Sequence, residues 1–212
     1  MIKIFQNTLI AGLGLGLVAC GDVEPKIDVD NDGVVYASSD NTDVNAAMRQ
    51  ARNTLPYFWR TYNKALAEFN LAQAALDRRA EEQAKNKTKK DNAPEKDNAP
   101  EDVISYEGPR DFSIKVSLRA TDGSLEHIWV NEVEQKDGLM HGNLANDPIN
   151  LPNLRIGQRI DFNNFQVSDW AYSLDNFFYG HFTTRALLPT MSGEEADAMR
   201  EILGENNLAD MQ

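Results

Sequence analysis

The sequence predicts an α+β fold, with N-terminal helices packed on a small, strongly bent antiparallel β-sheet or barrel and a short C-terminal helix. Two patterns of apolar residues predict it. Apolar residues recur every three or four positions over residues 42–80, whereas they alternate with polar residues from residue 109 onward. Five or six short strands within about 80 residues are typical of a small bent sheet.

The N-terminus has the composition of a bacterial lipoprotein signal peptide. Lys3 precedes an apolar run over residues 9–19, which is shorter than the roughly 20 apolar residues of a membrane-spanning helix. The tetrapeptide LVAC at residues 17–20 resembles the lipoprotein motif, whose cysteine receives diacylglycerol and an N-acyl chain and becomes the first residue of the mature protein. We therefore expect a signal peptide at 1–19 and lipid on Cys20, with a structural cysteine as the alternative.

Composition and the residue after the cysteine bear on partners and location. The 212-residue chain has 21 basic and 33 acidic residues and a formal net charge of −12, so it repels nucleic acid and we expect no nucleic-acid partner. The cysteine is followed by Gly21, whereas aspartate at that place is the enterobacterial signal for retention at the inner membrane. We expect attachment to the periplasmic side of a membrane, the outer one being favoured.

Residues 20–41 are acidic and rich in turn-forming residues, which predicts a tether between the lipid and the folded part. As a flexible coil such a segment spans about 25 Å. Asp28, Asp30 and Asp32 are spaced like the start of a calcium loop, but Ser39 stands where that loop needs a glutamate. A solvated linker is favoured, with weak calcium binding as the alternative.

Residues 42–80 are expected to form two helices. The first begins behind the capping candidates Thr42 and Asp43, and Pro56 is expected to interrupt it. An aromatic stripe in the second helix is interpreted as core. A partner-binding face that includes Trp59 and Tyr62 is the alternative.

Residues 81–108 are expected to be a disordered, low-complexity insert. The stretch from 81 to 102 contains no apolar side chain larger than alanine, and KDNAPE occurs twice in tandem within it. Burial of such side chains cannot offset the entropy lost on ordering.

Residues 109–189 are expected to form a β-rich module. Residues 112–119 alternate between apolar and polar, which predicts a half-buried strand. Asp175–Asn176 marks the turn of a final strand pair, whose second strand is expected within 177–188. The region 190–212 is expected to contain a short helix that begins with the capping-box pair Ser192 and Glu195 and is followed by a tail.

Five motifs, taken in order, resemble the YegJ-like family of bacterial proteins, a domain of unknown function numbered 2314. They are DVNAAMRQARNTLPYF, EHIWV, GNLANDP, SDWAY and GHFTTR. The resemblance covers residues 42–58 and 109–189, and it would place a glycine at the position of His181. It implies a compact bacterial domain, often exported or lipidated, without an established activity. Some members are thought to neutralise or bind other proteins.

The polar residues of these motifs supply the candidate catalytic site. Strand alternation puts His127 on one face with Trp129, and Asp169 and Arg185 are expected to pair across the final hairpin. A paired acid and base beside Trp129 and Trp170 fits a catalytic site. It fits a salt bridge that specifies the fold equally well, and the second interpretation is favoured.

The three histidines are the candidate metal ligands. His127, His141 and His181 are weak candidates for a zinc site, because three imidazoles suffice but no close local spacing brings them together. We expect no metal and no cofactor, apart from the covalent lipid on Cys20.

The sequence therefore favours a lipid-anchored envelope protein that acts as a non-enzymatic protein-interaction module. Its expected partner is another envelope protein, bound through exposed sheet edges or the aromatic helix stripe. Residues considered for binding are Trp59, Tyr62, Trp129 and Trp170. The alternatives are an envelope hydrolase that uses His127, Asp169 and Arg185, or a lipoprotein that protects against a toxin.

Overall fold

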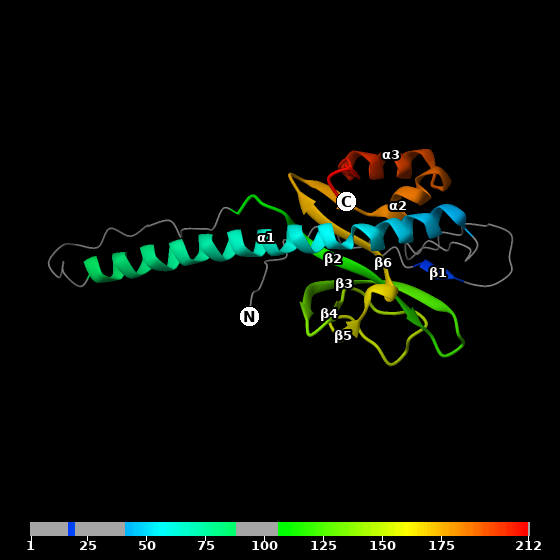
Figure 1. Ribbon diagram of the computed structural model, residues 1–212, viewed down its shortest axis with the longest axis horizontal. Coiled ribbons are helices and arrows are strands. Elements are labelled where there is room, and N and C mark those ends of the chain that lie inside the picture. The colour runs from blue at the N-terminus through cyan, green and yellow to red at the C-terminus, as the bar shows by residue number, and fades with distance from the viewer. Residues whose placement is uncertain (1–16, 20–40, 88–105, 212) are drawn as a thin grey trace.

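The computed structural model describes residues 17–19, 41–87 and 106–211 (Figure 1). Cys20, most of the expected tether and both KDNAPE copies lie outside the described residues. The helical elements are α1 (Thr42–Lys87), η1 (Asn164–Gln166), α2 (Phe182–Leu187), η2 (Leu188–Thr190) and α3 (Gly193–Ile202). The strands are β1 (Leu17–Ala19), β2 (Arg110–Arg119), β3 (Leu125–Lys136), β4 (Leu139–Leu144), β5 (Arg159–Phe162), β6 (Val167–Leu174) and β7 (Phe177–Gly180).

The expectation of two helices is wrong, because α1 is continuous through Pro56. A proline inside a helix removes one backbone hydrogen bond and costs about 3 kcal/mol. Pro56 is exposed, whereas Ala51, Leu55 and Phe58 on either side of it are buried in the same core. Docking of both segments on one sheet therefore outweighs the local cost.

The cap of α1 also differs from the expected one. The side chain of Asn41 accepts hydrogen bonds from the backbone N–H groups of Asp43 and Val44, at 3.1 and 3.0 Å. Asn41 is thus the capping residue, one position before the expected candidates. The amide oxygen satisfies two of the donors that the first helical turn leaves free.

The C-terminal half of α1 extends well beyond the sheet (Figure 1). Residues 81–87, expected to begin the disordered insert, continue this helix. Ion pairs of opposite charge four residues apart, Lys64–Glu68 and Glu81–Lys85, lie on its surface. Such pairs and good helix formers support a solvated helix even without large apolar residues.

The sheet is antiparallel and open, with strand order β5-β4-β3-β2-β6-β7, so the α+β class is confirmed and the sheet does not close into a barrel. β1 lies off this path and pairs with the first residues of β3. Register shifts interrupt the pairing of β2 with β6 and of β3 with β4. β-bulges of this kind generally increase the local twist of a strand and bend it.

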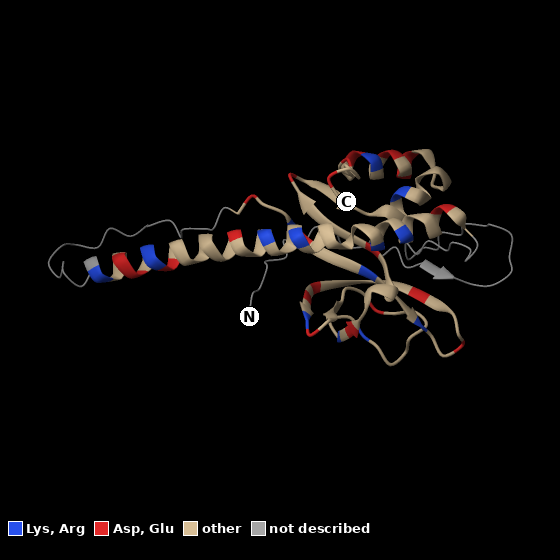
Figure 2. Ribbon diagram, in the orientation of Figure 1, with Lys and Arg blue, Asp and Glu red and all other residues tan. Residues whose placement is uncertain are grey.

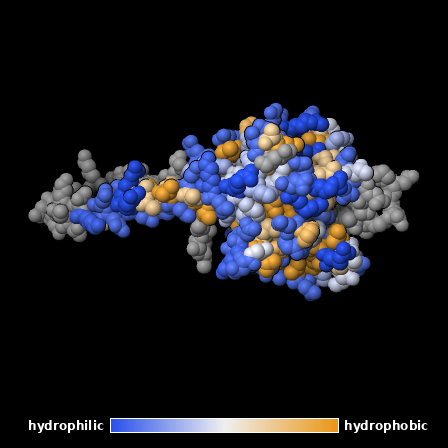
Figure 3. All heavy atoms as spheres, viewed as in Figure 1, coloured by the Kyte–Doolittle hydropathy of each residue, from blue (hydrophilic) through white to orange (hydrophobic). Residues whose placement is uncertain are grey.

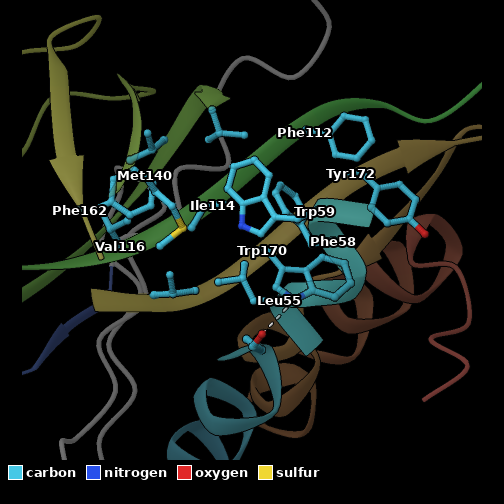
Figure 4. Packing of buried hydrophobic residues seen from close by; sticks show 14 of the residues in the cluster. Leu55, Phe58, Trp59, Phe112, Ile114, Val116, Met140, Phe162, Trp170 and Tyr172 are labelled. Atoms are coloured by element: carbon cyan, nitrogen blue, oxygen red, sulfur yellow. Dashed lines mark hydrogen bonds between the residues drawn. The ribbon is translucent and has the colours of Figure 1, made fainter. Parts of the chain in front are cut away.

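The main core fills the space between α1 and one face of the sheet (Figure 4). Trp170 at its centre is fully buried and packs against Phe58, Tyr57, Tyr172 and Phe182. Its indole N–H donates to the Ala51 carbonyl at 3.0 Å and lies 3.1 Å from the Thr54 hydroxyl. Trp170 therefore joins the helix to the sheet by both packing and hydrogen bonding.

The end of the β-rich module is shorter than expected. β7 ends at Gly180, and residues 182–187 form α2 instead of extending the strand. His181 makes the turn between them with φ of 50°, in the left-handed region. The capping box of α3 is confirmed, because Ser192 accepts from the Glu195 N–H and Glu195 accepts from the Ser192 N–H.

Within the part of the chain that is described, none of the helices is both long enough and apolar enough to cross a membrane.

Candidate functional site

The second face of the sheet carries a group of polar and aromatic residues from β2, β3, β6 and the start of α2. We call it the polar cluster. Lys115 of β2 pairs with Trp129 of β3 on one side and with Asp169 of β6 on the other. His127 lies two residues before Trp129 in β3, on the same face of the sheet. The cluster consists of Lys115, His127, Trp129, Asp169, His181 and Thr183.

Asp169 is completely buried and its carboxylate is fully engaged. One oxygen accepts from the backbone N–H groups of Trp170 and Phe182, at 2.9 and 3.0 Å. The other accepts from the backbone N–H and the hydroxyl of Thr183, at 2.8 and 2.5 Å. Burial raises the pKa of Asp169, while Lys115 and these donors oppose the rise. Asp169 thus fixes the start of α2 against β6.

Lys115 is an ammonium group buried inside the domain, with a relative exposure of 1%. Its Nζ lies 3.5 Å from the Thr183 hydroxyl and 4.9 Å from the centre of the Trp129 ring. Loss of solvation lowers the pKa of Lys115 to about 8, and the nearby Asp169 carboxylate limits the drop. A cation over an indole ring is a favourable contact that partly replaces water.

Both histidines of the cluster are held neutral. Burial and the charges of Lys115 and Arg52 lower the pKa of His127 to about 4. Burial and the charges of Lys115 and Arg185 lower the pKa of His181 to about 3. The His181 ring packs on Trp129, with ring centres 5.2 Å apart. His127 differs in that its buried Nδ1 has no hydrogen-bond partner among the described residues.

Arg185 does not pair with Asp169, contrary to expectation. Its guanidinium donates to the carbonyls of Gly180 and Gly204, at 2.8 and 2.6 Å, and lies 3.4 Å from that of Phe178. Its side chain lines an open surface hollow of about 420 Å³ together with residues from the C-terminal tail. Because α2 turns the chain away from the expected hairpin, Arg185 fastens the tail instead.

The three candidate catalytic residues therefore do not form one open site. His127 and Asp169 are sealed in the polar cluster, and Arg185 is engaged with backbone carbonyls at the hollow. A general base must reach a proton of the substrate within hydrogen-bond distance. In this arrangement Asp169 has no free lone pair directed to solvent, which fits the interpretation of these residues as fold-specifying.

The candidate metal ligands are also separated. His127 and His181 belong to the polar cluster, whereas His141 of β4 contacts Asp161 of β5, with Nδ1 and the carboxylate oxygen 2.6 Å apart. Among the described residues, no group of three or more histidine, cysteine, aspartate or glutamate side chains is arranged to hold a metal ion.

The aromatic residues considered for binding are mostly internal. Trp170 is fully buried and Trp59 is 8% exposed, so both belong to the core. Tyr62 is half-buried and packs edge-on against Trp59 and Phe112. Trp129 is half-buried between Lys115 and His181. The helix therefore docks on the sheet through Trp59 and Tyr62, and a partner-binding role for these two residues stays a prediction.

The sequence pattern gives little sign of two important residues of the cluster, Lys115 and Thr183. Lys115 occupies a position that alternation assigns to the solvent side of a half-buried strand, so its burial left no signal. Thr183 was noted only as part of a motif, although its hydroxyl joins Asp169 and Lys115. The motifs SDWAY and GHFTTR contain Asp169 and Thr183 and are both rich in hydrogen-bonding groups. Their proximity in the sequence was the available indication that the two residues interact.

Comparison with known proteins supplies the family. Residues 79–206 match the model of a family described as an uncharacterized protein conserved in bacteria, DUF2314. The chain belongs to this family. The matched region includes the whole sheet path from β2 to β7, α2 and α3, but not the N-terminal part of α1.

Two relatives show how far the likeness extends. The uncharacterized protein YegJ of Escherichia coli K12 is 33% identical over 100 residues, which is 47% of this chain and 64% of YegJ. A putative ankyrin repeat protein of Neisseria meningitidis serogroup B is 26% identical over 164 residues, 76% of this chain and 51% of that protein. The chain thus spans less than two thirds of either relative. No solved structure matches it.

Proposed function

We propose that this chain is a lipid-anchored protein of the bacterial cell envelope that binds another protein and has no catalytic role. The observation that carries the proposal is the state of Asp169, whose two carboxylate oxygens are buried and accept four hydrogen bonds from the protein itself. An acid used in this way stabilises a fold and has no capacity left for a substrate.

The lipid anchor rests on the LVAC tetrapeptide at residues 17–20. A thiolate is the side chain most readily alkylated near neutral pH, which suits Cys20 to receive diacylglycerol. Each buried methylene contributes about 0.8 kcal/mol, so several acyl chains hold a protein to a bilayer durably. The proposed site is the periplasmic side of a membrane, with the outer membrane favoured because Asp does not follow Cys20.

The binding role is supported by exposed surface of a suitable kind. The projecting half of α1 carries charges of both signs with apolar residues between them (Figures 2 and 3). Leu71 on this half is 72% exposed. One relative is named a putative ankyrin repeat protein, and ankyrin repeats stack into surfaces used for protein binding.

The anchor is tested by intact-protein mass spectrometry and membrane fractionation. We expect the wild-type protein to begin at Cys20, to carry the mass of the acyl chains and to sediment with membranes. Cys20→Ser is expected to remain uncleaved and unmodified. A wild-type protein with an unmodified thiol, or one recovered in the cytosol, would reject the anchor.

The binding role is tested by crosslinking in intact cells and recovery of the tagged protein. We expect one envelope protein to be enriched over a Cys20→Ser control. The variant Leu71→Lys on the projecting helix distinguishes two candidate binding surfaces. Loss of the partner would point to α1, and retention of the partner would point to an edge of the sheet. Repeated recovery of no enriched protein would count against a binding role.

A further inference from the structure

We propose that the first three residues of β3 form an edge to which a partner protein adds an extended strand, with a hydrogen-bonding side chain opposite His127. This inference rests on the proposed function, since it requires cleavage before Cys20. Three observations carry it: the place of β1, the direction of the β3 backbone groups and the unpartnered Nδ1 of His127.

β1 already demonstrates that the edge accepts a strand. Leu17, Val18 and Ala19 pair antiparallel with His127, Glu126 and Leu125. All three β1 residues precede Cys20, so lipoprotein processing would remove the whole strand. The mature protein would then expose the backbone groups that β1 satisfies before cleavage, and an open edge is a template for another chain.

The direction of these backbone groups follows from the neighbouring hydrogen bonds. The Trp129 carbonyl accepts from the Ala145 N–H at 2.8 Å, so Trp129 points its N–H and C=O toward the β4 side. Pairing with β2 is continuous through this part of β3, and successive residues of a strand point their backbone groups to opposite sides. Leu125 and His127 therefore point theirs toward β1, and Glu126 points toward β2.

His127 gives the edge a chemical preference. Its side chain is 4% exposed, and within the described part of the chain its Nδ1 has no hydrogen-bond partner. A residue directly opposite in an antiparallel pair lies on the same face and within reach. Leu17 is the residue that pairs with His127 before cleavage, and leucine has no side-chain group that can donate or accept a hydrogen bond. A partner strand with serine, threonine or asparagine there would satisfy the imidazole.

The rest of the edge favours an aliphatic strand. The Glu126 carboxylate is buried and accepts from the backbone N–H groups of Ile149 and Asn150, at 2.7 and 2.9 Å. It thereby fixes a loop whose Ile149 side chain is 55% exposed beside the edge. The expected ligand is an extended aliphatic segment with one small polar residue.

The test uses the mature lipidated protein in detergent and a synthetic peptide. The peptide carries residues 15–19, flanked by lysines for solubility, in its natural form and with Leu17→Ser. We expect the serine form to bind about tenfold more tightly, because it satisfies a buried polar atom. In the His127→Phe variant we expect both peptides to bind and the preference for serine to disappear.

Backbone methylation of the peptide gives a matched control. Methylation of the nitrogen at position 17 or 19 removes a donor directed at β3 and is expected to abolish binding. The same change at position 18, whose N–H points away, is expected to be tolerated. Equal effects at positions 17 and 18, or no binding of either peptide at millimolar concentration, would overturn the inference.

Hydrogen exchange distinguishes a partner strand from other occupants of the edge. Together with the state of Cys20, it also distinguishes failure of this inference from failure of the proposed function. Fast exchange at the Leu125 and His127 amides of the mature protein, with protection on adding peptide, is expected. Protection without peptide would mean that the tether or a second copy fills the edge, and would overturn the inference alone. An unprocessed Cys20 would overturn the anchor and the inference together, because β1 would remain in place.

Discussion

The two faces of the same three strands are both buried, but they are built from opposite chemistry. On the α1 side, β2, β3 and β6 contribute Ile114, Val130 and Trp170 to an apolar, aromatic core. On the other side, the same strands contribute Lys115, Trp129 and Asp169 to the polar cluster. Covering a sheet face therefore does not require that the face be apolar, provided that its polar groups find partners inside.

The two faces differ in what holds them together. The apolar face depends on close packing of large rings, whose removal leaves cavities. The polar face depends on hydrogen bonds to Asp169 and on a lysine and two histidines whose ordinary charge is disfavoured by burial. Stability of the first should depend little on pH, whereas stability of the second should depend on it strongly.

Loss of the central ring of the apolar face is expected to have the largest effect. Trp170→Ala should lower the free energy of unfolding by about 4 kcal/mol, because it creates a large cavity and removes the indole hydrogen bond to the Ala51 carbonyl. The measurement is urea denaturation followed by circular dichroism at pH 7.

A matched pair of milder variants separates packing from hydrogen bonding. Trp170→Phe removes an indole N–H that has partners, whereas Trp59→Phe removes one that has none. The first variant should therefore be the less stable by about 1 kcal/mol. Equal stability of the two would show that the bond from Trp170 to α1 contributes nothing.

Sequence reasoning predicted the apolar face well. Period-two alternation over residues 112–119 puts Phe112, Ile114 and Val116 on one face of a half-buried strand, and all three lie in the core. The pattern also gave the α+β class and the capping box at Ser192. These features depend on local periodicity and on short-range hydrogen bonds, which a single sequence records.

The polar face was not predictable in the same way. A strand in which apolar and polar residues alternate is predicted to be half-buried, with its polar face in solvent. Lys115 belongs to that polar face, so the pattern predicts that it is exposed. Its burial depends on α2, which brings Thr183 and His181 over the sheet from about 70 residues away in the chain, a long-range placement that alternation does not encode. The expected pairing of Asp169 with Arg185 is absent for the same reason, because the helical turn after Gly180 takes Arg185 away from Asp169.

Two local sequence features, the residue at position 181 and Pro56, differ in how well they predict the backbone. A glycine was expected at the position of His181, and that residue has φ of 50°. Glycine adopts this left-handed conformation freely and histidine only at a cost, so the expected glycine is consistent with the observed turn. Pro56 was given too much weight, because long-range packing of α1 outweighs a local helix breaker.

Acid is expected to weaken the polar face selectively. His127 binds a proton in the unfolded chain below its ordinary pKa, but in the folded protein only below about 4. Between these two pKa values, protonation of His127 favours the unfolded chain. The free energy of unfolding is therefore highest above about pH 6.5 and decreases as the pH falls toward 4. At pH 4 the loss should reach about 3 kcal/mol.

The variant His127→Phe tests this acid dependence. It should be close to wild type in stability at pH 7 and more stable than wild type at pH 4. Urea denaturation across pH 4–7 measures both values, and His181 should account for part of the slope that remains. An unchanged slope in His127→Phe would show that this imidazole is not held neutral by the fold.

Replacing the buried ammonium should stabilise the protein. Methionine has a volume similar to that of lysine and no charge, so for Lys115→Met we expect a net gain of about 2 kcal/mol at pH 7, after subtraction of the lost contacts with Trp129 and Thr183 and the lost attraction to Asp169. The folded pKa of about 8 lies below the ordinary value, so the wild-type protein should gain stability as the pH rises from about 8 to 10.5. Lys115→Met should lack this rise.

The exposed Lys136 at the end of β3 provides the control for that variant. Lys136→Met removes the same charge and should change stability by less than about 0.5 kcal/mol. If Lys115→Met were instead strongly destabilising, the ammonium would be a net source of stability, and the polar face would resemble a fully satisfied network.

The smallest expected effect concerns a single hydroxyl on the polar face. Thr183→Val keeps the shape of the side chain but removes the hydrogen bond to Asp169, and should cost about 1 kcal/mol by urea denaturation at pH 7. Thr184→Val makes the same chemical change one residue later, where the hydroxyl lies 3.4 Å from His181 and does not contact Asp169. It should cost less than half as much. Equal costs would mean that Asp169 does not need all four of its donors, and that the polar face is held by burial of α2 more than by hydrogen bonding.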